Sequence, residues 1–259
     1  MTHSPAFVAT IALCGGTSRR MNVPDKTALP FGAGTILDSA LTGLPPGLVV
    51  CVGEPRPVHT RDDGARQLIW TRETPTGGGP VAGIRAGLEA VLTQLTQCTE
   101  FTAPTQLMGP AETPEPTTST TAHDRPFPPH LAEHRDPLVA VIAGDQPFAG
   151  RIVPYLADEL GEQLLHGSPL DGIPDGMAVA SPGRDEPALL LAVYRLRALD
   201  SVIPRDSDDL GVYRTLTGLK IEVTAPELPI DELLTIDVDD PDDLARATAI
   251  LERLQGQGL

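Results

Sequence analysis

The sequence has few aromatic residues and few cysteines, and each shortage narrows what the protein can be. Phe, Trp and Tyr make up 3% of the chain, against 41% hydrophobic residues in all, so the core must rest on Val, Ile, Leu and Ala. The three cysteines, Cys14, Cys51 and Cys98, lack the close spacing of a zinc site. We therefore expect free thiols and a cytoplasmic protein.

Basic residues are also scarce: Lys and Arg number 19 against 35 Asp and Glu, giving a net charge of −16. Such an acidic chain argues against nucleic acid and against an anionic membrane as partners, because both attract basic surfaces. No apolar run approaches the roughly 20 residues of a membrane span, and residues 1–5 lack the basic stretch of a secretory signal. We expect neither membrane association nor secretion.

Strand and helix patterns alternate along the chain, which predicts an α/β fold with a mostly parallel sheet. The predicted strands are 7–13, 48–53, 68–71, 138–144, 177–181, 188–194 and 219–223. Helices are expected after a cap at Thr35, from Pro80, and from Pro241 with Asp240 as cap. We expect one domain over 1–259.

A Pro- and Thr-rich stretch at about 97–137 cannot form a packed core and is predicted to be a flexible insert. It should leave the sheet at the edge opposite the carboxyl ends of the strands. We therefore expect deletion of about residues 100–135 to leave activity intact, and loss of turnover in a folded deletion variant would contradict this. His130 and His134, four residues apart in the insert, are expected to be solvated.

The most informative segment is residues 12–31. A buried strand pattern that includes Leu13 and Cys14 stops at Gly15-Gly16, and Ser18, Arg20 and Lys26 follow. Glycines let the backbone approach an anion closely, and basic side chains neutralise phosphates. The common Gly-x-Gly-x-x-Gly and Gly-x4-Gly-Lys-Ser/Thr loops are absent. The segment predicts a different nucleotide-phosphate loop, with a plain strand–turn–helix corner as the alternative.

Two further segments carry residues of a candidate site. Gly77 to Gly79 precede the helix from Pro80, where amide donors and the helix dipole favour anions, and Glu73 lies just upstream. Asp145 follows the buried strand 138–144, where packing gives no reason for a carboxylate. Carboxylate oxygens suit Mg²⁺, so Asp145 is predicted to bind it. A flexible glycine turn and a helix-capping aspartate are the respective alternatives.

Asp237 and Asp239 precede the helix capped by Asp240 and are candidate secondary metal ligands. They alternate on an extended segment, so at most one should face a given site. A purely structural role for both is equally open. Asp240 and Asp243 are explained by helix capping.

The order Leu-x-Gly-Gly-x-Ser-x-Arg-Met-x3-Asp-Lys from Leu13 to Lys26 resembles the molybdenum cofactor guanylyltransferase family, whose signature reads Leu-Ala-Gly-Gly-x-Ser-x-Arg-Met-Gly-x-x-Asp-Lys. Cys14 replaces the alanine, and Asn22 replaces the glycine after Met; Asn tolerates positive φ well. Three more segments follow in family order. They are Gly79-Pro-Val-Ala-Gly83 with Glu73 in place of the family's aspartate, Asp145-Gln-Pro-Phe148, and 236–244 with aspartates in place of two asparagines.

The resemblance implies a three-layer α/β/α sandwich with a Rossmann-like, mostly parallel sheet, as in the nucleotide-diphospho-sugar transferases. It implies Mg²⁺-dependent transfer of GMP from GTP to the phosphate of molybdopterin, with transient contacts to molybdoenzymes or cofactor-biosynthesis proteins. The implied catalytic residues are Arg20, Lys26 and Asp145, and the implied metal ligands are Asp145 with Asp239 or Asp237. The implied nucleotide-binding residues are Leu13, Cys14, Gly15, Gly16, Ser18, Lys26, Glu73, Gly79 and Asp145.

A looser segment, Pro187 to Tyr194, resembles the family's acceptor side, where Arg184 and Arg195 are candidates to meet a pterin phosphate, with ordinary surface arginines as the alternative. Two alternatives stay open. One is a nucleotidylyltransferase for another base or acceptor, such as cytidylyl transfer to molybdopterin or transfer to a sugar phosphate. The other is a nucleotide-binding module without catalysis.

Overall fold

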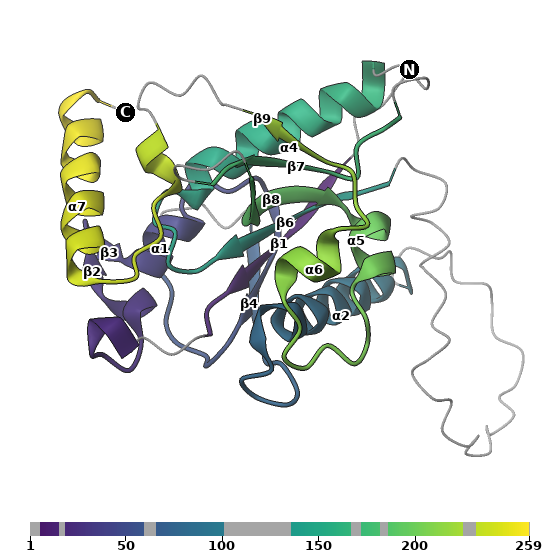
Figure 1. Ribbon diagram of the computed structural model, residues 1–259, viewed down its shortest axis with the longest axis horizontal. Helices are drawn as coiled ribbons and strands as arrows, with labels where there is room; N and C mark the ends of the chain where they lie inside the picture. Colours follow the sequence, from purple (N-terminus) through teal and green to yellow (C-terminus); the bar gives the residue numbers. More distant parts are fainter. Residues whose placement is uncertain are drawn as a thin grey trace, which may run out of the picture.

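The computed structural model describes residues 6–15, 19–59, 66–100, 136–166, 172–181, 186–224 and 232–258. Within these ranges one sheet of seven strands forms the centre of the molecule (Figure 1). Its strands, in spatial order, are β5 (Arg66–Thr71), β4 (Gly47–Val52), β1 (Phe7–Leu13), β6 (Leu138–Ala143), β8 (Pro187–Arg195), β7 (Gly176–Ala180) and β9 (Ile221–Thr224). A small hairpin joins β2 (Pro30–Phe31) and β3 (Gly34–Thr35) beside it.

The sheet is mostly parallel, as predicted, with one exception. Strands β5, β4, β1 and β6 run in the same direction, and β7 is parallel to β9. Strand β8 is antiparallel to both of its neighbours. The register pairs Leu13 with Val52 and with Ala143, and Val52 with Thr71. The loops that follow β1, β4, β5 and β6 therefore meet at one edge of the sheet, which we call the carboxyl edge.

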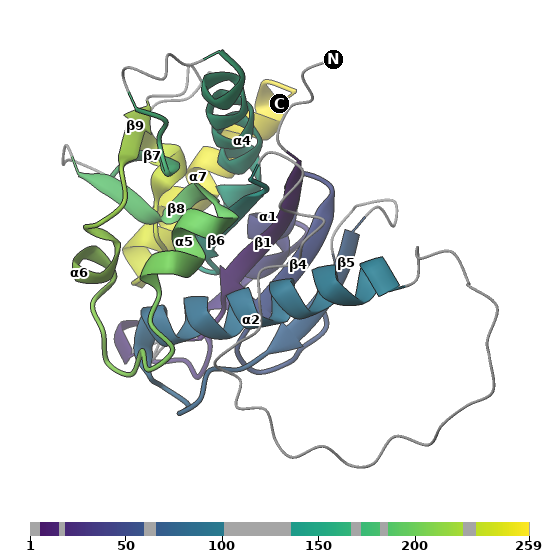
Figure 2. The same cartoon turned by 90° about the vertical axis from the view of Figure 1, so that its right-hand side faces the viewer.

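Helices cover both faces of the sheet and give the predicted three layers. Helices α1 (Ile36–Leu41), α4 (Ala149–His166) and α7 (Pro241–Gly256) pack on one face, and α2 (Gly79–Glu100), α5 (Leu196–Val202) and α6 (Val212–Leu216) pack on the other (Figures 1 and 2). Alternate residues of the central strands point into the two layers: Ala140 of β6 joins the first core, and Val141 the second. Burial of these two apolar layers is the main source of stability.

Two helix starts confirm the capping residues expected from the sequence. Thr35 caps α1 in a reciprocal capping box with Asp38, and Asp240 caps α7 in another with Asp243. Helix α2 begins at Gly79, so Pro80 is its second residue rather than its first. Helices α4, α5 and α6 were not predicted, and α4 contains Pro154, which obscures its helical pattern.

Helix α2 lies unusually close to the central strand β1. A Cβ built on Gly87 would lie 2.4 Å from Ile11 Cγ2, and one built on Gly83 would lie 3.0 Å from Leu13 Cδ2. Any larger residue at Gly87 would collide with the strand. The Gly-Pro-Val-Ala-Gly motif thus places the α2 start against the end of β1 by close packing.

The insert and the cysteine thiols are the remaining features for which the sequence made predictions. Helix α2 continues to Glu100, beyond the expected start of the insert at residue 97, and residues 101–135, with His130 and His134, lie outside the described residues. Cys14 and Cys51 are free and buried, as expected; the contact with Cys14, together with burial, raises the pKa of the Cys51 thiol. The described helices include none long and apolar enough to cross a bilayer.

Candidate active site

The first part of the site is the end of β1. The Cys14 amide donates to Val52 O at 2.8 Å, and the Gly144 amide donates to Leu13 O at 2.8 Å. The sheet therefore extends one residue past each strand and fixes where the glycine loop begins. Cys14 is buried there and Gly15 is exposed at the carboxyl edge, whereas Gly16 and Ser18 lie outside the described residues.

The cations of the loop stand on two short 3₁₀ helices, η1 (Arg19–Met21) and η2 (Lys26–Ala28). Asn22 between them has a φ of 51°, so the predicted left-handed turn is confirmed with Asn in the place of the family's glycine. The side chain of Arg20 is 75% exposed, whereas that of Lys26 is 16% exposed. The loop thus offers one solvent-facing cation and one half-buried cation.

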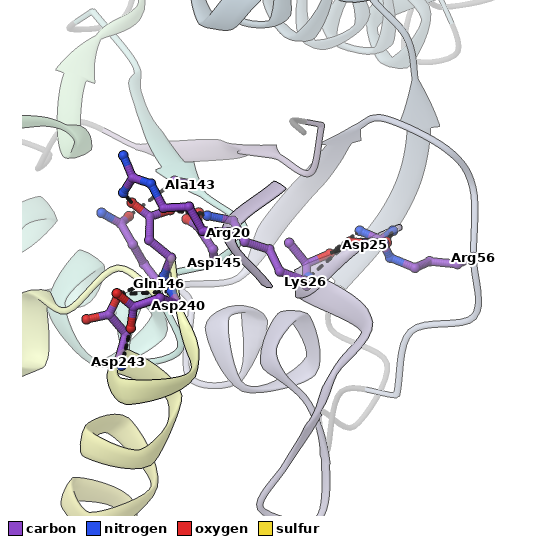
Figure 3. Close-up of polar contacts among 11 residues, drawn as sticks. Arg20, Asp25, Lys26, Arg56, Ala143, Asp145, Gln146, Asp240 and Asp243 are labelled. Carbon is purple, nitrogen blue, oxygen red and sulfur yellow. Dashed lines mark hydrogen bonds and ion pairs between the residues drawn. The ribbon is translucent and has the colours of Figure 1, made fainter. Parts of the chain in front are cut away.

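Lys26 joins two carboxylates from distant parts of the chain (Figure 3). Its Nζ lies 2.5 Å from Asp145 Oδ2, at the end of β6, and also pairs with Asp239 Oδ1 ahead of α7. Burial lowers the pKa of Lys26, but Asp145 and Asp239 outweigh burial and hold this pKa above its usual value. Arg20 Nη1 lies 3.5 Å from the other oxygen of Asp239. The structure thus brings together Arg20, Lys26, Asp145 and Asp239, as the sequence predicted.

The two carboxylate oxygens of Asp145 differ: Oδ2 pairs with Lys26, and Oδ1 does not. Its Oδ1 is buried and has no hydrogen-bond partner. A buried carboxylate oxygen without a partner is costly, so such an atom calls for a ligand or a function. The backbone of Asp145 is fixed, because its carbonyl oxygen accepts from the Val238 amide at 3.0 Å. This bond also holds the segment 236–239 against the end of β6.

The two aspartates before α7 occupy different positions. Asp239 pairs directly with Lys26, and its amide donates to Asp243 Oδ2 at 3.0 Å, which ties it to the α7 capping box. Asp237 instead bonds the Gln146 side chain. Partial desolvation, and next the charge of Asp145, raise the pKa of Asp237 to about 6. The residue is nevertheless exposed at the surface, so solvent screens part of this effect. As the alternation predicted, one of the two makes direct contact with Lys26.

Gln146 was missed by the sequence analysis. Its side chain is buried, and its Oε1 accepts from the Ala143 amide at 3.2 Å. It therefore closes the turn that presents Asp145 and also holds Asp237. The position directly after Asp145 was the available signal.

The glycine segment Gly77–Gly79 lies beside the glycine loop that follows β1. Glu73 Oε1 accepts from the Gly77 amide at 3.0 Å and would lie 3.9 Å from a Cβ on Gly15. Gly79, the first residue of α2, has a φ of 86°, which favours glycine although nothing fills the space around it. The Asp209 amide donates to Gly78 O at 2.9 Å, so the loop before α6 supports this turn. Glu73 thus lies beside Gly15 and beside the turn that leads into Gly79.

The expectation for Arg195 is wrong. Arg195 is the last residue of β8 and pairs in register with Leu138, the first residue of β6. Because β8 runs antiparallel, Arg195 lies at the edge opposite Asp145, where its guanidinium pairs with Asp136 and Asp175. Arg184, the other arginine expected near the acceptor, lies outside the described residues.

Among the described side chains, no group of three or more His, Cys, Asp or Glu residues is arranged to hold a metal ion. What the site offers is a pair of oxygen-donor carboxylates, Asp145 and Asp239, bridged by an ammonium, with Arg20 and two glycine turns around them. Such an arrangement suits an anionic ligand that brings its own oxygens to a cation. Basic side chains of this kind bind phosphates, and carboxylates bind the cations that accompany them.

Comparison with known proteins identifies the family of this chain. Residues 10–216 match the model of the family described as MobA-like NTP transferase domain. The molybdenum cofactor guanylyltransferase of Mesorhizobium japonicum is 37% identical over 87 residues, which make up 32% of this chain and 39% of that protein. The match with that relative thus spans well under half of its length.

Solved structures share the fold. The molybdopterin-guanine dinucleotide biosynthesis protein A of Archaeoglobus fulgidus superposes with a TM-score of 0.51 at 20% identity, over 95% of this chain and all (100%) of that one. A 4-diphosphocytidyl-2C-methyl-D-erythritol synthase gives a TM-score of 0.51 at 12% identity, over 95% and 98% of the two chains. At these identities the likeness is one of fold. Because the family match covers most of the chain, including the end of β1, all of β6 and both glycine segments, this chain belongs to the MobA-like NTP transferase family and is a nucleotidyltransferase.

Proposed function

We propose that this nucleotidyltransferase transfers GMP from GTP to the phosphate of molybdopterin and releases pyrophosphate. The choice of guanine and of molybdopterin is supported by the name of the Mesorhizobium relative and by the order of the sequence motifs. The observation that carries the chemistry is the cluster of Lys26, Asp145 and Asp239 at the carboxyl edge, with Asp145 Oδ1 buried and unpaired.

The reaction is a displacement at phosphorus. An oxygen of the molybdopterin phosphate forms a bond to the α-phosphorus of GTP while the bond from that phosphorus to the bridging oxygen breaks, and the electron pair leaves with pyrophosphate. The attacking phosphate is already an anion, so the site needs no general base. What the protein has to supply is alignment and neutralisation of charge.

The residues of the site have corresponding tasks. The backbone after Leu13 and the turn at Gly79 would border the nucleotide, since both leave room for a bulky anion beside amide donors. Arg20 and Lys26 would neutralise phosphate oxygens; Lys26 is held by Asp145 and Asp239, whereas Arg20 extends into solvent. Glu73 beside Gly15 would border the nucleoside.

Mg²⁺ fits the carboxylates of the site. Asp145 and Asp239 provide hard oxygen donors, and the unpaired Oδ1 of Asp145 is the kind of buried atom that a cation satisfies. When bound, Mg²⁺ would neutralise charge on the phosphates and on the leaving pyrophosphate. Asp237, beside Gln146, would support the same cluster.

The test is release of pyrophosphate from GTP, CTP, ATP and UTP, each with Mg²⁺, with and without molybdopterin. We expect release from GTP with molybdopterin, and its loss in Asp145→Asn. Asp242→Asn is the matched control, because Asp242 is an exposed aspartate in the first turn of α7. Release from CTP instead would assign a cytidylyltransferase, and release that needs a sugar phosphate would assign another acceptor. No release from any nucleotide would favour a binding module.

A further inference from the structure

The side chain of Arg56 holds both neighbours of Lys26. Arg56 Nη1 pairs with Asp25 Oδ2, and Nη2 donates to Thr27 Oγ1 (Figure 3 shows the contact with Asp25). The other oxygen of Asp25 accepts from the Thr27 amide at 2.9 Å and from the Thr27 hydroxyl at 2.8 Å. One planar guanidinium therefore clamps the residues before and after Lys26.

The clamp is anchored in the sheet. Arg56 lies in the loop after β4, and its guanidinium carbon stands 5.4 Å from the ring centre of Trp70 on the neighbouring strand β5. The side chain of Arg56 is 18% exposed and that of Asp25 is 29% exposed. A half-buried arginine whose two nitrogens bond two residues and whose guanidinium lies over an aromatic ring is held more rigidly than an arginine in a surface ion pair.

The clamp lies behind the reactive cluster. Lys26 opens the 3₁₀ helix η2, whose cap is Asp25, and its ammonium reaches forward to Asp145 and Asp239. A backbone fixed on both sides fixes the Lys26 Cα, and the two ion pairs at Nζ then restrict the four side-chain torsions. The side chain of Arg56 contacts Asp25, Thr27 and Trp70, so it acts on the carboxylate cluster through η2.

We propose that Arg56 is a positioning residue that sets the place of the Lys26 ammonium. The turnover part of the test rests on the proposed function, but the placement of Lys26 does not. Lys26 and Lys220 are the two lysines of the chain. Their relative reactivity therefore reports on the environment of Lys26, with Lys220 as a reference inside the same molecule.

The experiment labels the folded full-length protein with a small amine-acetylating reagent and follows both lysines by mass spectrometry. In the native protein Lys26 should react slowly, because its side chain is 16% exposed. The Lys220 side chain also has partners, Glu222 and Gly172 O, but it is 45% exposed and should react faster. In Arg56→Ala we expect the Lys26-to-Lys220 labelling ratio to rise at least severalfold. We expect kcat to fall about tenfold to a hundredfold, by analogy with small misplacements in active sites, with a smaller change in KM.

Arg85→Ala is the matched control. Arg85 is likewise half-buried and pairs with Asp200 at 2.5 Å and with Ile203 O at 3.1 Å, but it joins α2 to α5. The Arg85→Ala variant should lose a comparable free energy of unfolding, with no change in Lys26 labelling or in kcat. Arg56→Lys keeps the charge over Trp70 but lacks the fork that reaches Asp25 and Thr27 together, so it should also raise Lys26 labelling.

Unchanged Lys26 labelling in folded Arg56→Ala or Arg56→Lys would overturn the proposal, as would equal effects of Arg85→Ala. If Arg56→Ala fails to fold, Arg56→Lys alone decides. Should the native protein release no pyrophosphate from any nucleotide, the proposed function fails, yet the labelling ratio still tests the clamp.

Discussion

Lys26 Nζ and Asp145 Oδ2 lie 2.5 Å apart at the carboxyl edge of the sheet, and this contact joins the first loop of the fold to the strand at its centre. The same ammonium also pairs with Asp239, so three separate segments converge on it. Each segment has its own support: the Arg56 clamp behind Lys26, the Val238 amide on the Asp145 carbonyl, and the α7 capping box behind Asp239.

The first prediction separates the contribution of the Lys26–Asp145 contact to stability from its contribution to turnover. Lys26→Met should lower stability by about 1–3 kcal/mol, because the half-buried Asp145 loses its nearest cation. It should also reduce turnover about 100-fold or more. The double variant Lys26→Met/Asp145→Asn should regain stability in urea unfolding but no activity. A double variant as unstable as Lys26→Met would show that the ion pair is not what stabilises this edge.

The second prediction concerns the close contact of α2 with β1. Gly87→Ala should cost about 1–3 kcal/mol, since the new methyl group would overlap Ile11. Gly256→Ala near the end of α7 meets nothing within 4 Å and should be neutral or slightly stabilising. Thermal unfolding of both variants measures the difference. Equal melting temperatures would mean that the helix can move away from the strand without cost.

The third prediction concerns pH. The pKa of Asp237 is raised to about 6, so the folded state keeps this proton longer than the unfolded chain does, and ionisation weakens the fold as pH rises from about 4 to 6. Asp237→Asn should therefore be more stable than the native protein at pH 7.5, by about 1 kcal/mol after allowance for solvent screening. The advantage should vanish near pH 4. Unfolding in the presence of a chelator tests this, and an advantage of equal size at both pH values would contradict it.

The fourth prediction tests the α7 capping box as support for Asp239. Asp243 accepts from the Asp239 and Asp240 amides, so Asp243→Ala should cost about 1 kcal/mol and also lower kcat. Thr35→Ala removes the cap of α1 instead of the cap of α7, and should cost similar stability with full activity. If both variants lose activity equally, the effect arises from general loosening rather than from Asp239.

Much of the site could be predicted because its residues sit where local sequence rules apply. An apolar run that stops near glycine, interrupted in β1 only by Thr10, identified β1 and β6, and hence the carboxyl edge with Cys14 and Asp145. The left-handed Asn22 and the cap at Asp240 follow from the conformational preferences of single residues. These features depend on neighbours in sequence, so the sequence contains them.

The features that were predicted wrongly or overlooked depend on contacts between segments that are distant in the sequence. A strand pattern is the same in either direction, so the antiparallel course of β8 was invisible and Arg195 was assigned to the wrong edge. Arg56 belongs to no motif; its importance arises only when β4 and β5 bring Trp70 beneath it and η2 beside it. Gln146 was overlooked because an amide next to a candidate metal ligand attracts no attention by its chemistry.

The bridging position of Lys26 has a thermodynamic consequence under the proposed function. The ammonium already pairs with Asp145 and Asp239, so a cation arriving alone competes with it. The free energy of displacing Lys26 is therefore subtracted from the binding free energy of that cation. A triphosphate offers Lys26 a new anionic partner and removes that competition. Nucleotide and metal should then strengthen each other's binding by the same factor, because such coupling is reciprocal.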